Sequence, residues 1–152
     1  MSPLPSRVTG DPLRLVLVLI GVVTVLTGLV QLVVPGAVLD VLSAESTPTG
    51  RHLFATVGMF MIVIGGLVVQ GLLSPAPPSY LPLWVGLQKF AASVLVAVAV
   101  ARDLFGPVAL LVAAFDFATA ILCALMWRRL LIHRAGAPAV PTEEPAATKE
   151  RT

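Results

Sequence analysis

Charged residues are scarce in this chain, making up 12% of its 152 residues where soluble domains carry roughly 25%. This scarcity excludes an ordinary water-soluble domain. The apolar share of 57% also excludes an intrinsically disordered chain, because disorder requires low hydrophobicity and high net charge. A net charge of +2, scattered along the chain, is too small for a nucleic-acid-binding surface. The composition is that of an integral membrane protein.

Cysteine and histidine are also nearly absent. The single cysteine, Cys123, excludes an intrachain disulfide and a cysteine-cluster metal site. Because the chain has two histidines in all, no histidine pair lies inside an apolar stretch to hold haem or a metal ion. We therefore predict no metal site, and the sequence identifies no cofactor.

Four apolar stretches are present, each close to the ~20 residues that a helix needs to cross a bilayer. They cover about residues 13–34, 53–73, 81–101 and 106–127. All 13 prolines lie outside these stretches or at their edges, where proline does not interrupt a helix. The sequence predicts an all-α fold, a bundle of four transmembrane helices in a multi-pass protein of the cell membrane.

The placement of arginine predicts the orientation of the chain. Arginines precede the first span and follow the fourth, whereas the loops at the opposite end carry no excess of positive charge. Because basic residues concentrate on the cytoplasmic side, we expect both termini in the cytoplasm. Residues 1–12 are then a cytoplasmic segment, residues 13–134 the membrane domain, and residues 135–152 a disordered tail. The first apolar run, at about 20 residues, exceeds that of a signal peptide, so we expect an uncleaved helix.

Lys89 and Asp116 are the charged side chains that fall in the interior of the predicted spans, away from their ends, where a charge costs ~2.5–3.5 kcal/mol even on a lenient scale. At about 1.5 Å per residue, Lys89 lies ~12 Å from the cytoplasmic start of the third span. Asp116 lies ~16 Å from the cytoplasmic end of the fourth span by the same rise. These two spans are antiparallel neighbours because a short turn joins them, and a lysine side chain is long enough to bridge the difference. The sequence predicts a buried Lys89–Asp116 ion pair.

Each predicted helix carries a stripe of small and polar residues at intervals of three and four. Such stripes let helix backbones approach closely, and packing explains most of them. We expect all four stripes to face a common, weakly polar interior. The candidate catalytic residues there are Asp116 and Lys89, and the candidate ligand-binding residues are Gln88, Ser93, Thr119, Gln31 and His52. A proton donor, a metal ligand and an interfacial histidine are all open roles for His52, and its isolation favours the last.

Three further features belong together. The first span begins with Arg14 and ends at Pro35, the second carries Gly58, Gly65 and Gly66, and a short turn precedes the fourth. In these features, over about residues 13–130, the chain resembles the DoxX-like group of small four-helix proteins of bacterial inner membranes. The resemblance implies a role near respiratory, quinone or thiol-redox functions. Met61 stands where that group often carries a glutamate, so no chemistry of that carboxylate is implied.

Three functions fit these residues. The first is a non-enzymatic membrane protein that holds a lipophilic molecule, such as a quinone, a lipid or an isoprenoid-like compound, near the Lys89–Asp116 pair. The second is a membrane-embedded isomerase or cyclase in which Asp116, kept neutral by burial, donates a proton. The third is a small proton-coupled transporter. We favour the first, since no nucleophile and base surround the pair, and a structural role in fixing helix register stays open. The bilayer is the expected partner, with a homo-oligomer or a partner membrane subunit as open alternatives.

Overall fold

The computed structural model describes residues 10–135, so most of the predicted N-terminal segment and of the predicted tail lies outside it. Its helices are α2 (Pro12–Val33), α3 (Pro35–Val41), α4 (Pro48–Leu73), α5 (Tyr80–Ala101) and α6 (Ala109–Ala135). This part of the chain contains no strand, and the predicted all-α fold is confirmed. Helices α2, α4, α5 and α6 are long and apolar enough to span a membrane. The protein is an integral, multi-pass membrane protein.

Side-chain caps and prolines set where the long helices begin. The Asp11 carboxylate accepts hydrogen bonds from the backbone N–H groups of Leu13 and Arg14 at 3.1 and 3.4 Å, and Pro12 follows as the first helical residue. In the same way, the Thr47 hydroxyl accepts from the backbone N–H of Gly50 at 3.0 Å, before α4. Helix α4 therefore begins at Pro48 and not at residue 53, where its apolar run begins.

Pro35 divides the segment after the first span into two helices. Proline lacks an N–H group and its ring clashes with the preceding turn, so α2 cannot continue through it. The chain starts again as the short helix α3, with Pro35 in its first turn. The sequence analysis did not predict α3, because its seven residues are too few for a recognisable period.

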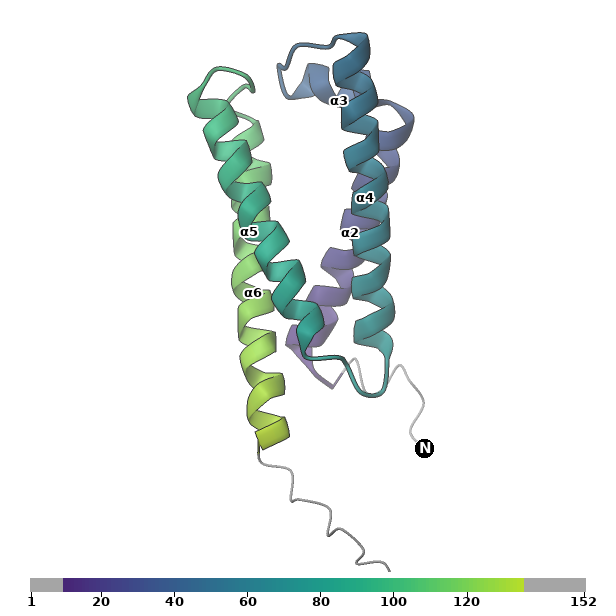
Figure 1. Ribbon diagram of the computed structural model, residues 1–152, viewed down its shortest axis with the longest axis vertical. Helices are drawn as coiled ribbons and strands as arrows, with labels where there is room; N and C mark the ends of the chain where they lie inside the picture. The colour runs from purple at the N-terminus through teal and green to yellow at the C-terminus, as the bar shows by residue number, and fades with distance from the viewer. Residues whose placement is uncertain (1–9, 136–152) are drawn as a thin grey trace, which may run out of the picture.

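The four long helices form two antiparallel pairs. Helix α2 packs along α4 and α5 packs along α6, whereas contacts between the two pairs are few (Figure 1). Glycines bring α2 and α4 together: a Cβ atom added to Gly58 would lie 2.7 Å from the carbonyl oxygen of Gly28. The expectation that all four stripes face one interior is wrong, because the stripe of the second span, which contains Gly66 and Gln70, is exposed on α4. Gly58 and Gly65, which lie outside that stripe, are the glycines that pack against α2.

The two pairs meet near the end of the molecule where α4 connects to α5. Buried side chains from all four long helices form a core there, namely Leu17, Val68, Leu72, Val85, Cys123 and Met126. At the opposite end the loops touch, and the backbone N–H of Gly106 donates a hydrogen bond to the carbonyl of Leu42 at 2.7 Å. The helix pairs are therefore fastened to each other at both ends.

Arg14 strengthens the contact between α2 and the end of α4. Its side chain is 9% exposed, and its Nε and Nη2 atoms donate hydrogen bonds to the carbonyls of Leu72 and Ser74, each at 2.5 Å. A cation suits this place, because the last carbonyls of a helix have no partner within the helix and carry partial negative charge. The arginine that begins the first span thus closes the C-terminal end of α4.

Candidate functional site

The predicted contact between Lys89 and Asp116 is present. Lys89 Nζ lies 2.6 Å from Asp116 Oδ1, and the two side chains are 6% and 10% exposed. The residues come from α5 and α6, the antiparallel neighbours that carry them at similar depth. Lys89 Nζ also lies 5.9 Å from the centre of the Phe115 ring, a distance at which the ring face attracts a cation. Whether the ion pair serves a function or only stability stays a prediction.

Three of the predicted ligand-binding residues lie next to the ion pair in the sequence of α5 and α6. Ser93 and Thr119, each about one turn from a charged partner, are buried, and the Thr119 hydroxyl donates to the carbonyl of Phe115 at 2.8 Å. Gln88 precedes Lys89, and its Oε1 atom is buried without a hydrogen-bond partner. A buried polar atom of this kind requires an explanation, because nearly all such atoms in native proteins are paired.

Gln31 and His52 are not brought to the ion pair. Gln31 lies ~28 Å from the start of α2, near the end of that helix. Lys89 lies ~14 Å from the start of α5, which is at the end of the molecule where α2 begins. The Gln31 amide donates to the carbonyl of Phe54 at 3.0 Å and so joins α2 to α4. His52 is exposed in the second turn of α4. Gln31 therefore contributes to the contact between α2 and α4, and His52 lies on the molecular surface.

Thr24 is a residue of the site that the sequence analysis did not select. A cavity of about 10 Å³ lies beside Lys89, and Thr24, Lys89 and Thr119 are the hydrogen-bonding residues among those that line it. The sequence did contain a signal, since Thr24 lies in the small-residue stripe of the first span. Its depth along α2, ~18 Å, places it close to the level of the ion pair.

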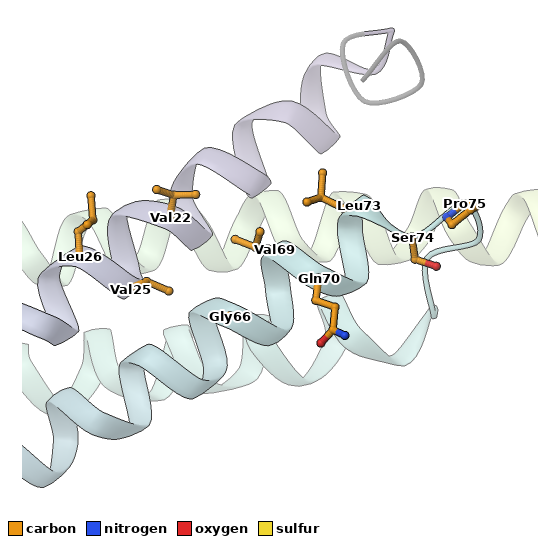
Figure 2. Close-up of a pocket in the computed structure, with 9 residues that line it drawn as sticks. All are labelled: Val22, Val25, Leu26, Gly66, Val69, Gln70, Leu73, Ser74 and Pro75. Atoms are coloured by element: carbon orange, nitrogen blue, oxygen red, sulfur yellow. The ribbon is translucent and has the colours of Figure 1, made fainter. Parts of the chain in front are cut away.

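A larger hollow lies elsewhere, on the surface between α2 and α4. It measures about 790 Å³ and is open and almost wholly apolar (Figure 2). None of the predicted site residues lines it; its members are Val22, Val25, Leu26, Gly66, Val69, Gln70, Leu73, Ser74 and Pro75. An apolar groove on a transmembrane pair faces acyl chains as an ordinary part of the lipid-facing surface. The hollow therefore gives the ion pair no binding space.

Cofactor ligands are not gathered at the site. Between residues 10 and 135, no group of three or more His, Cys, Asp and Glu side chains comes together to hold a metal ion. Cys123 is buried in the core between the helix pairs. The chemistry that the site offers is that of one ion pair with hydroxyl and amide groups around it.

Comparison with known proteins gave no match among family models, curated proteins or solved structures.

Proposed function

We propose that this membrane protein binds a lipophilic small molecule, such as a quinone, a lipid or an isoprenoid-like compound, whose polar group contacts the Lys89–Asp116 pair. The observation that carries the proposal is the burial of this pair within membrane-spanning helices. A buried ion pair is a costly way to gain stability, because apolar side chains of similar volume often serve as well or better. Ionisable residues inside membranes accordingly mark binding and transport sites.

The groups around the pair suit the polar end of an otherwise apolar molecule. Lysine has three N–H donors, and the one hydrogen bond described for Lys89 uses one of them. Gln88 adds a buried amide oxygen that has no partner. The remaining surroundings are apolar side chains and lipid, which fit a hydrocarbon body.

Binding requires the two helix pairs to move apart beside Lys89. The adjoining cavity, at about 10 Å³, holds no more than one water molecule. Few contacts join α2 and α4 to α5 and α6, so such a movement breaks little packing. The resemblance to the DoxX-like group is in line with a quinone as ligand and belongs to the same proposal.

The enzymatic and transport alternatives need a proton on Asp116 during part of their cycles. Asp116 Oδ1 accepts a hydrogen bond from Lys89 at 2.6 Å, so this oxygen is engaged as an acceptor and not as a proton donor. No observation in the described residues favours either alternative, and we do not advance them.

The proposal is tested by measuring binding to the protein reconstituted in nanodiscs. Lipophilic compounds that co-purify with the protein are identified by mass spectrometry of extracts, and ubiquinone and menaquinone analogues are titrated directly. We expect Lys89→Met to weaken binding about tenfold or more, because hydrogen bonds to charged groups contribute about 1.5–3 kcal/mol.

Two further variants make the result decisive. The double variant Lys89→Met/Asp116→Leu removes both charges without leaving one unpaired, and Gln70→Leu alters the outer groove alone. Gln70→Leu is expected to bind like the parent protein. A folded double variant that binds the same compounds with parental affinity excludes the site.

A further inference from the structure

Two cavities of equal size lie in the core between the helix pairs, and both are lined mainly by apolar residues. Each measures about 10 Å³. One is lined by apolar side chains and Cys123, and the other includes Thr24, Lys89 and Thr119 in its lining. A water molecule needs a cavity of roughly 10–15 Å³ and two to four polar partners. The second cavity offers those partners and the first does not.

Thr24 differs from three other threonines of the membrane helices. Thr27, Thr56 and Thr119 each donate a hydrogen bond to the carbonyl four residues earlier, at 2.8 to 3.0 Å. Thr24 makes no such bond in the described part of the chain, although it is only 5% exposed. Thr24 lies in the lining of the second cavity, where its hydroxyl is available to a molecule inside.

The two other polar residues complete the set. Lys89 gives one N–H to Asp116 and has two more to donate. The Thr119 hydroxyl gives its hydrogen to Phe115, so its oxygen can accept one. A molecule in this cavity therefore meets the charged N–H donors of Lys89, the Thr24 hydroxyl, which can donate or accept, and the Thr119 oxygen, which can accept. Water satisfies this combination, because it donates two hydrogen bonds and accepts two.

We propose that the cavity between Thr24, Lys89 and Thr119 binds one water molecule. The water accepts from the Lys89 ammonium, shares a hydrogen bond with the Thr24 hydroxyl and donates to the Thr119 oxygen. Because Thr24 belongs to α2, the water joins the ion pair of α5 and α6 to the other helix pair in the middle of the membrane. The inference does not rest on the proposed lipophilic ligand, since the water is expected in the protein without one, and a ligand that reaches Lys89 would displace it.

The composition of the chain permits a direct test. Lys89 and Lys149 are its two lysines, so Lys149→Arg leaves a single lysine Nζ signal in protein labelled with ¹⁵N-lysine. In bilayers studied by magic-angle-spinning NMR, we expect magnetisation to pass from water to Lys89 Nζ. Thr24→Val, which removes the hydroxyl at nearly constant volume, is expected to lower that transfer by more than half.

Thr27→Val is the matched control, because Thr27 is exposed and bonds its own helix; its water transfer is expected to equal the parent's. An absence of transfer in the parent, or equal transfer in Thr24→Val, overturns the proposal. A crystal structure that resolves ordered waters is a second measurement. Density about 3 Å from both Lys89 Nζ and Thr24 Oγ1 is expected, and a Thr24 hydroxyl bonded to the carbonyl of Ile20 beside an empty cavity contradicts it.

Discussion

Lys89 and Asp116 each remove much of the cost of burying the other. The ammonium group lies 2.6 Å from the carboxylate and near the face of Phe115, so an anion and an aromatic ring both stabilise its positive charge. Neither residue has another charged partner within the described part of the chain. The energetic consequence is asymmetric: loss of one partner is expensive, and loss of both is not.

The first prediction concerns this asymmetry. Lys89→Met is expected to lower the free energy of unfolding by about 3–5 kcal/mol, because it leaves a buried carboxylate unpaired. Lys89→Met/Asp116→Leu is expected to recover most of the loss. Unfolding by SDS in mixed micelles, followed by circular dichroism, measures both. A double variant as unstable as the single one means that the pair belongs to a larger polar network.

Depth along the helices was sufficient to predict the ion pair from the sequence, because both residues lie on helices joined by a short turn. The same reasoning could not place Gln31 and His52, since a stripe of residues gives a face but not a partner. Thr24 was overlooked for a related reason. A threonine that bonds its own helix and one that does not are identical in sequence, and only the structure separates Thr24 from Thr27.

At the scale of the helices, glycine determines how closely α2 approaches α4. Gly58 faces the backbone of α2, where an added Cβ atom would lie 2.8 Å from the backbone nitrogen of Leu32. Gly66, two turns further along α4, would have no atom within 4 Å of an added Cβ. Both are glycines of the same helix, but Gly58 lies against the backbone of a neighbouring helix and Gly66 faces open space.

The second prediction uses this matched pair. Gly58→Ala is expected to destabilise the protein by roughly 1–3 kcal/mol, because its methyl group forces the two backbones apart. Gly66→Ala is expected to be neutral or to stabilise α4 by up to about 1 kcal/mol, through the higher helix propensity of alanine. The SDS midpoint of each variant decides the matter, and equal midpoints mean that close approach does not hold the pair together.

The four membrane helices were predictable because apolar length is a direct requirement of the bilayer. Their ends were less so, because hydrophobicity marks the portion within the membrane and not the helix itself. Helix α6 continues to Ala135, past the predicted limit at residue 127, and α4 begins at the Thr47 cap. The Thr47-Pro48 sequence is a recognisable start signal that the apolar run concealed.

For the whole molecule, the third prediction is the orientation, which the structure leaves open. In a Cys123→Ala background, Thr49→Cys places a thiol in the first turn of α4, and Ala76→Cys places one in the connection between α4 and α5; both positions are exposed. If basic residues lie inside, a membrane-impermeant maleimide labels the first in intact cells and the second only after permeabilisation. The reverse pattern puts both termini outside.

Pairing of the helices could be predicted only in part. The short turn fixed α5 against α6, but nothing in the stripes distinguished two pairs from one symmetric bundle. The distinction depends on which glycines meet, as Gly28 and Gly58 do, and a sequence does not state which small residues will touch. The small number of contacts between the two helix pairs is therefore seen in the folded structure and could not be predicted from the sequence.

The hydrogen bond from Gly106 to Leu42 at one end and the apolar core at the other restrict how the molecule can deform. Because the two helix pairs are joined at both ends, they cannot separate by a hinge movement at one end. The two helix pairs can instead bow apart along their length, and the widest separation then falls between the two points where they are joined. Lys89 and Asp116 lie between these two contacts, so we expect bowing to be the movement by which the proposed ligand would reach them sideways from the bilayer, while both water-facing ends stay shut.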